Sequence, residues 1–369
     1  MSSKWLKSLL VAAFGICTVF FYNMSLAQEG QNNPPSGQQL NPKQDKEGEL
    51  DVAGTILEHI RDDHSWHLWG HTSLPLPVIL KTDKGWEMFS SSRLSDEHHK
   101  PVIYNGNYPY KQIEGKIRVV NSDGSVNVEE SKKLYDFSIT KNVLSMLISV
   151  ALLLIIFLGV ARAYKKTGVS SAPKGFQSFI EPVIIFIRDE VARPCLGHQT
   201  DRFMPFILNI FFFIWINNLL GIVPFFPGGA NLSGNIAFTF TLALFTFVIT
   251  NVNGKGDYWK HIFWMPGLPV PLKIFLMPIE LLGVFIKAIS LTIRLFANIT
   301  AGHILVLSLV SLIFIFKAVS ASVVVVPFTV FIGVIELLVG FIQAFIFAML
   351  SALYIGMAIE ENHEQDLVL

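Results

Sequence analysis

The chain has 369 residues, no formal net charge, 51% hydrophobic residues and only 15% charged residues. A soluble domain carries about 25% charged residues, whereas residues 203–254 contain no Asp, Glu, Lys, Arg or His. Such a run is stable only in lipid or among other lipid-buried helices. The composition therefore predicts a polytopic membrane protein, and without a basic stripe we expect no nucleic-acid partner.

The first 47 residues have the composition of a leader and a linker. Residues 1–27 carry two lysines, an apolar run at residues 9–21 and a small-residue cleavage site, Ser-Leu-Ala, at residues 25–27. This pattern predicts a secretory signal peptide, with an uncleaved anchor helix as the alternative. Residues 28–47 are rich in Gln, Asn, Pro and Gly, and we expect a disordered linker outside the cytoplasm.

Residues 48–137 form a polar region that we interpret as a small β-rich domain outside the cytoplasm. Its strand-like stretches lie at residues 102–104, 115–120 and 125–128, and Asn-Gly and Asp-Gly turns separate them. Short alternating segments between such turns are typical of antiparallel sheets.

Four histidines gather at the start of this region, beside aspartates and tryptophans. Histidine is a zinc ligand, so a metal site is one interpretation. However, the spacings match no standard zinc site and no cysteine lies nearby. A polar, aromatic face at the membrane surface is the favoured interpretation. The histidines are His59, His64, His67 and His71.

The remaining chain, residues 138–369, is predicted to be the membrane domain. Lys and Arg follow the first span at residues 162–166 and the third at residues 255–260, which marks these ends as cytoplasmic. This places the β-rich domain outside, in agreement with a signal peptide, and the C-terminus in the cytoplasm. We expect the chain to lie in the inner membrane of a bacterial cell. The predicted spans are residues 143–161, 203–226, 235–252, 271–316 and 320–360.

Two further features complete the predicted architecture. Residues 176–191 combine apolar side chains with four charges, which is typical of an amphipathic helix on the inner membrane surface. The last two spans are too long for one straight crossing, since residues 271–316 would extend more than about 60 Å as a helix. We therefore predict an all-α membrane protein of about five membrane helices with a long, tilted, antiparallel C-terminal hairpin, plus the small β-rich domain.

Ionisable residues recur at helical intervals along the last two spans. Glu280, Lys287 and Arg294 are seven residues apart, so they share one helical face with a drift of about 20° per step. Asn298 stays near that face because it is four residues beyond Arg294. On the last span a glutamate and a glutamine are again seven apart, at positions 336 and 343.

The antiparallel pairing of these two helices can be predicted from the position of their turn. A turn near residue 319 places His303 level with Glu336, and Arg294 level with Gln343. The arginine would then lie near the middle of the bilayer, and the His303–Glu336 level would lie towards the outside.

A mid-membrane arginine requires a reason, because insertion scales assign it roughly 2.5–3.5 kcal/mol. A purely structural ion pair is one explanation. No acidic residue of the chain matches the level of Arg294, however, and the side chain is too central to reach an interface. We therefore favour a functional cation whose partner carboxylate lies on another subunit.

The same residues carry a resemblance to subunit a of the F-type ATP synthase. "RLFANITAGH" at residues 294–303 resembles that family's "RLFxNxxAG(E/H)" segment, and "GFIQAFIFAMLSALYI" at residues 340–355 resembles its "LQAFIFxxLxxxY" segment. "NNLLGIVP" at residues 217–224 is similar to the preceding hairpin. The resemblance covers residues 140–361 and does not extend to the β-rich domain.

The resemblance implies a role for most of these positions. Arg294 matches the essential arginine, Asn298 the nearby asparagine and Gln343 the glutamine that faces the arginine. Glu280 falls at the acidic position of the cytoplasmic access channel. His303 and Glu336 reverse the arrangement of many bacterial members, which place Glu on the first helix and His on the second.

The resemblance also implies the partners and the activity. It indicates a non-catalytic stator subunit in the lipid bilayer that faces a rotating c-ring, contacts the b-subunit peripheral stalk and conducts protons through two offset half-channels. We expect no cofactor, and no nucleotide-binding GxxxxGK[ST] loop is present. The alternatives are a secondary transporter whose embedded arginine binds an anionic substrate, or a scaffold for an envelope complex.

Overall fold

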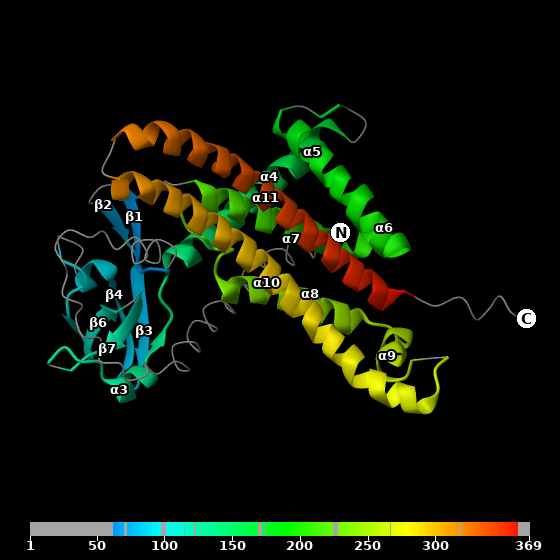
Figure 1. Ribbon diagram of the computed structural model, residues 1–369, viewed down its shortest axis with the longest axis horizontal. Helices are drawn as coiled ribbons and strands as arrows, with labels where there is room; N and C mark the ends of the chain where they lie inside the picture. The colour runs from blue at the N-terminus through cyan, green and yellow to red at the C-terminus, as the bar shows by residue number, and fades with distance from the viewer. Residues whose placement is uncertain are drawn as a thin grey trace, which may run out of the picture.

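The computed structural model describes residues 62–69, 72–96, 101–113, 115–121, 123–168, 172–173, 175–223, 228–265, 267–316 and 319–360. The predicted signal peptide and linker, His59 and His71 lie outside these residues. The described chain consists of a small N-terminal β domain and a bundle of long helices (Figure 1).

The β domain contains three small antiparallel sheets. The first pairs β1 (Ser65–Trp69) with β2 (Thr72–Pro75). The second has the order β4-β3-β8 and the third the order β5-β6-β7. Their strands are β3 (Pro77–Thr82), β4 (Gly85–Ser90), β5 (Tyr104–Asn105), β6 (Pro109–Ile113), β7 (Lys116–Val119) and β8 (Tyr135–Asp136), with the short helices η1 (Ser91–Leu94) and α3 (Val128–Lys132) between them.

Two of the expected strand-like stretches are shorter in the structure. Of residues 102–104, only Tyr104 belongs to a strand. Residues 125–128 contribute a single bridge, between Val126 and Val120. The stretch ends there because the Asn127 side chain accepts a hydrogen bond from the Glu130 N–H and caps α3. The prediction at residues 115–120 agrees with β7.

The β domain has its own core between the second and third sheets. Alternation turns Val78, Leu80 and Phe89 to one face of the β4-β3-β8 sheet, and they are buried against Tyr110 and Val119 of the third sheet. Full burial of an apolar side chain of this size contributes about 1.5–3 kcal/mol. The opposite face of the β4-β3-β8 sheet is left outside this core.

Backbone hydrogen bonds connect the β domain directly to the first membrane helix. After β8, Phe137 N–H donates to the Ile79 carbonyl (2.9 Å) and Ile139 N–H donates to the Pro77 carbonyl (3.1 Å). The Thr140 hydroxyl then caps the helix. The first helix residue, Lys141, donates its N–H to the Asp63 carbonyl (2.9 Å), so the first described residues of the β domain lie beside its exit into α4.

Among the described residues, five helical runs are long and apolar enough to cross a membrane, which agrees with the predicted number. The helices are α4 (Lys141–Thr167), α5 (Phe176–Phe186), α6 (Arg193–Leu196), α7 (Thr200–Ile222), α8 (Ile236–Asn253), α9 (Gly256–Phe263), α10 (Val270–Phe316) and α11 (Val319–Ile359), with the short turns η2 (Ile187–Ala192) and η3 (Gly197–Gln199).

The stretch predicted as a surface helix, residues 176–191, forms α5 and most of η2. Helix α5 continues through the π-helical η2 into α6, which ends just before Gly197, where φ is 52°. The chain folds back there, because the Thr200 hydroxyl lies 3.4 Å from the Ala192 carbonyl, and η3 then leads into α7. Both η2 and α6 pack against α11.

The predicted C-terminal hairpin is confirmed as two long helices that pack side by side (Figure 1). From α10, Leu291, Leu295 and Ile299 recur every four residues and are buried in the bundle core. From α11, small residues recur at the same interval, which allows close helix approach. They are Ala344, Ala348 and Ala352.

Candidate functional site

His303 of α10 and Glu336 of α11 lie in direct contact within the helix bundle. His303 Nδ1 is 3.2 Å from Glu336 Oε1, and the glutamate is 8% exposed. This is the pairing that the predicted register places at one level. Gly302 makes room for it, because a Cβ there would lie 3.1 Å from Glu336 Oε1.

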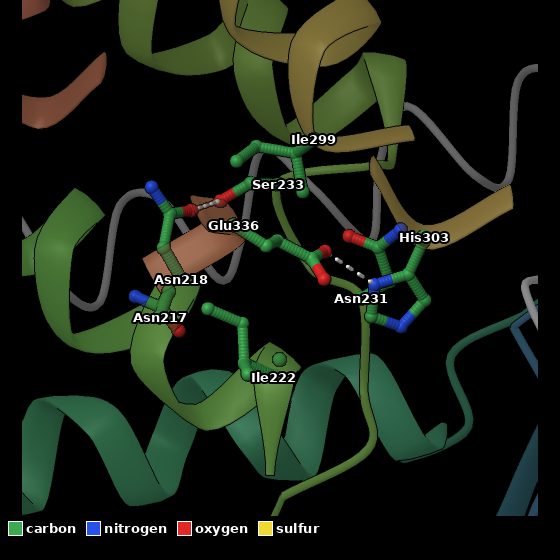
Figure 2. A pocket seen from close by; sticks show the side chains of 9 residues that line it. Asn217, Asn218, Ile222, Asn231, Ser233, Ile299, His303 and Glu336 are labelled. Carbon is green, nitrogen blue, oxygen red and sulfur yellow. Dashed lines mark hydrogen bonds and ion pairs between the residues drawn. The ribbon is translucent and has the colours of Figure 1, made fainter. Parts of the chain in front are cut away.

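The pair opens onto a small cavity that α7 and the segment before α8 complete (Figure 2). We call it the His303 cavity. Ser233 donates a hydrogen bond to Asn218 Oδ1 (2.6 Å), and Asn218 donates to the Gly340 carbonyl of α11 (3.0 Å). Its polar lining residues are Asn217, Asn218, Asn231, Ser233, His303 and Glu336.

Two polar atoms of this lining have no hydrogen-bond partner among the described residues. They are Asn217 Oδ1 and Asn231 Nδ2, and both are buried. The other amide atom of each is used, since Asn217 Nδ2 donates to the Phe213 carbonyl and Asn231 Oδ1 accepts from the Gly234 N–H. Buried polar atoms of this kind are normally satisfied by water.

A second small cavity lies between α8, α9, α10 and α11, and we call it the Lys287 cavity. Lys287 Nζ is 5.5 Å from the centre of the Tyr354 ring. Thr246 and Ser351 share a hydrogen bond of 3.0 Å that links α8 to α11 beside it. The polar lining residues are Thr246, Thr250, Asn251, Tyr258, Lys287 and Tyr354.

Arg294 lies on α10 between the segments that line the two cavities. Leu291 borders the Lys287 cavity and Ile299 borders the His303 cavity, and the eight helical steps from one to the other rise about 12 Å. The arginine is exposed on the surface of the chain. No hydrogen bond or ion pair joins it to another residue in the described part of the chain.

The remaining predicted residues are not brought together into one cluster. Asn298 is exposed, whereas Gln343 is buried and 7% exposed. No hydrogen bond links Arg294 to Gln343 among the described residues. Glu280 is half-buried on α10, one helical heptad before Lys287.

The histidines of the β domain form no metal cluster within the described residues. His64 is 3% exposed, and its Nε2 is 2.9 Å from Asp136 Oδ2. Burial alone lowers the pKa of His64, but the ion pair and hydrogen bond with Asp136, aided by Asp62 and Asp63, raise the pKa overall. For Asp136, burial alone raises the pKa of the carboxyl group, but the interactions with His64 and Ser138 lower the pKa overall.

The neutral polar side chains of both cavities are the residues that sequence reasoning missed. Asn217 and Asn218 stand within a long uncharged run, and a polar pair inside an apolar helix is a usable signal. Tyr354 is the tyrosine of the segment at residues 340–355 that carries the family resemblance. Asn231 and Ser233 carry no such signal, because only the packing of separate segments brings them to the cavity.

Comparison with known proteins shows the family of the chain. Residues 143–356 match the sequence profile of the ATP synthase A chain, and residues 55–137 match a domain of unknown function. The chain is 46% identical to ATP synthase subunit a of Chloroherpeton thalassium over 236 residues, which are 62% of this chain and 69% of that protein.

Two further relatives show similar coverage. ATP synthase subunit a 2 of Chlorobaculum tepidum is 43% identical, over 63% of this chain and 66% of the relative. ATP synthase subunit a of Myxococcus xanthus is 42% identical, over 63% of this chain and 76% of the relative. The match spans about two thirds or more of each relative, and a profile match covers more than half of the chain. The chain is therefore a multi-pass membrane protein of the ATP synthase A chain family.

Proposed function

We propose that this chain is the stator subunit of the ATP synthase membrane sector, and that it conducts protons through two half-channels that Arg294 separates. The observation that carries the proposal is the placement of Arg294. The guanidinium is exposed, without an ion pair among the described residues, and it lies between two polar cavities.

The exposed guanidinium supports a partner outside this chain. An arginine remains charged at any accessible pH and binds carboxylates through a planar fork. A carboxylate on each subunit of a rotating c-ring would supply that partner and would be ionised only while it faces Arg294. The b-subunit peripheral stalk would hold this chain in place while the ring turns.

The two cavities support separate access routes from the two sides of the membrane. In the His303 cavity, an imidazole and a carboxylate in contact can accept and release protons, and the free amide atoms can order water between them. In this proposal the cavity opens to the outside, and the Lys287 cavity leads towards Glu280 and the cytoplasm. A proton then crosses only on the ring carboxylate, because the cation at Arg294 repels it from the direct path.

Replacing Arg294 tests the proposal. Arg294→Ala should abolish proton-driven ATP synthesis by the assembled complex in membrane vesicles, because nothing then ionises the ring carboxylate or blocks the leak. Arg294→Lys should also lose most synthesis, because an ammonium lacks the fork and can release its proton. Synthesis and dye-reported proton pumping are measured together.

A matched variant separates this effect from failure to assemble. Arg93→Ala removes an exposed arginine of the β domain that contacts Tyr104, and it should leave synthesis unchanged. If Arg294→Ala vesicles contain the assembled complex and still couple proton flow to synthesis, the proposal is wrong.

A further inference from the structure

The outer face of the β4-β3-β8 sheet has no part in the proposed function. Strand register places Ile79 opposite Met88, and Lys81 opposite both Trp86 and Tyr135. Their neighbours Val78, Leu80 and Phe89 point to the core instead, so the paired residues share the opposite side of the sheet. We call this side the aromatic face; it consists of Ile79, Lys81, Trp86, Met88, Tyr135 and Phe137.

The aromatic face is ordered and open. Trp86 is 63% exposed and Met88 is 70% exposed. The rings of Trp86 and Phe137 are 5.6 Å apart, and Lys81 Nζ is 5.4 Å from the Trp86 ring. The six side chains include one cation and no acid. Contiguous exposed apolar patches on a folded domain mark an interaction surface.

The connection to α4 holds this face close to the membrane. Phe137 bonds to β3 and is followed three residues later by Thr140, which caps α4. Because α4 is apolar enough to cross the membrane, the edge of the aromatic face lies within a few residues of the bilayer surface. The ladder continues up to Ile139, so no flexible segment lets the sheet swing away.

The layering of the β domain leaves the aromatic face uncovered. The buried side of β3 packs on Tyr110 and Val119 of the third sheet. The aromatic face is the other side of the same sheet, and its Trp86 and Met88 side chains are exposed.

We propose that the aromatic face docks on the lipid headgroup region beside α4. Trp86, Tyr135 and Met88 bury their apolar atoms among the upper acyl chains, where the polar edges of tryptophan and tyrosine remain hydrated. Lys81 extends along Trp86 and places its ammonium at the lipid phosphates. The lack of acidic side chains fits an anionic bilayer, which repels carboxylates.

A spin label at Met88 tests this placement in the full chain. Cys17 and Cys195 are replaced by Ser, a nitroxide is attached to Met88→Cys, and the protein is reconstituted in vesicles of phosphatidylcholine and phosphatidylglycerol. Electron paramagnetic resonance then compares collisions with oxygen, which concentrates in lipid, and with a water-soluble nickel chelate. The ratio of oxygen to nickel collisions should be several-fold higher than for a water-exposed label.

The matched control is a label on the far side of the same domain. Lys111 of β6 pairs with Arg118 of β7, and its neighbour Tyr110 points to the core. A Lys111→Cys label should therefore collide freely with the nickel chelate. Equal nickel accessibility at the two positions would overturn the proposal.

Two variants sharpen the outcome. In the Met88 label background, Lys81→Glu should lower the oxygen-to-nickel ratio in vesicles that contain phosphatidylglycerol, and an unchanged ratio would overturn the phosphate contact. The Met88 label is also measured in the whole ATP synthase complex. If nickel is excluded there but not in the reconstituted chain, another subunit covers the face and the lipid proposal is wrong.

Discussion

The side chains of His303 and Glu336 lie at one level of the helix bundle. Their Nδ1 and Oε1 atoms are 3.2 Å apart in a polar cavity, so replacing either side chain would leave the other without its partner. In the proposed function this acid and imidazole would relay protons whichever helix carries which group.

Exchange of these two residues gives a prediction at this scale. Glu336→Gln should lower ATP-driven proton pumping at least about tenfold, because a general acid–base group typically contributes two or more orders of magnitude. The double variant His303→Glu with Glu336→His should recover a large part of the pumping rate. Pumping is followed by dye quenching in inverted vesicles.

A distant carboxylate provides the control for this experiment. Glu190 is exposed on η2 and lines neither cavity, so Glu190→Gln should pump at the normal rate. A double variant no more active than Glu336→Gln would show that the pair is not an interchangeable relay.

For single residues, helical periodicity predicts which side chains of the two long helices lie at the same level. It does not place side chains outside these helices. His303 and Glu336 are predicted to lie at one level because they are almost equally far from the turn near residue 319. The prediction holds because both helices are continuous between the turn and the pair. Asn231 and Ser233 could not be placed in this way. They lie before α8, in a segment without helical period, and reach the cavity only through the folding of that segment.

Close packing of helix α11 on α6 depends on one glycine. A Cβ at Gly356 would collide with the backbone carbonyl of Cys195. Backbone atoms cannot move aside as a flexible side chain can, so the two elements would have to separate. This contact joins the end of the long hairpin to the helical run that starts at α5.

Substitution of this glycine is therefore predicted to destabilise the bundle. Gly356→Ala should lower the free energy of unfolding by about 1–3 kcal/mol, the usual cost of overpacking a core. Gly159→Ala on α4 is the control, because a Cβ there meets no atom within 4 Å and alanine favours a helix by about 1 kcal/mol. The midpoint temperature of thermal unfolding in detergent should be lower for Gly356→Ala than for the unmodified chain, and Gly159→Ala should not lower it. Equal midpoints for the two variants would contradict the packing argument.

Most elements could be predicted from the sequence, and those that could not have a common cause. The apolar runs predicted at residues 235–252 and 271–316 agree with α8 and α10 to within one residue at each end. The π turn of η2 was not foreseen, because no residue type marks an inserted backbone residue. The α3 turn was also missed, since Asn127 reads equally as a loop residue and as a helix cap.

For the molecule as a whole, the buried pair His64–Asp136 locks the start of the β domain to its end. His64 belongs to the first described segment and Asp136 lies just before α4. The pair stabilises the fold only while His64 is protonated and Asp136 is ionised. Because the folded pKa of His64 is raised, this stabilisation is fully present below its unfolded pKa and is lost as pH rises through the folded pKa.

The contribution of Asp136 to stability depends on pH in the opposite direction to that of His64. The folded pKa of Asp136 is lowered, so its stabilisation is present above the unfolded pKa and is lost as pH falls through the folded pKa. The β domain of the full chain should therefore resist limited proteolysis best in mildly acidic solution, and resistance should fall towards alkaline pH.

Removing the imidazole tests this dependence. His64→Asn should cost near the lower end of the roughly 3–5 kcal/mol typical of breaking a buried pair, since Asp136 keeps some solvent contact. It should also flatten the alkaline fall in resistance. His198→Asn, at an exposed position in η3, serves as the control, and an unchanged pH profile in His64→Asn would contradict the assignment.

The meeting of the β domain's two ends has a consequence for how such a chain can change over evolution. Asp62 accepts hydrogen bonds from the Thr140 hydroxyl (2.8 Å) and the Asn142 N–H (3.1 Å), so the first described residue of the domain lies beside its exit. A module with adjacent ends can be inserted or lost without altering the spacing of the helices that follow. The two profile matches, which end at residue 137 and begin at residue 143, divide the chain at this same junction. Evolution can therefore exchange the module while the membrane domain stays intact.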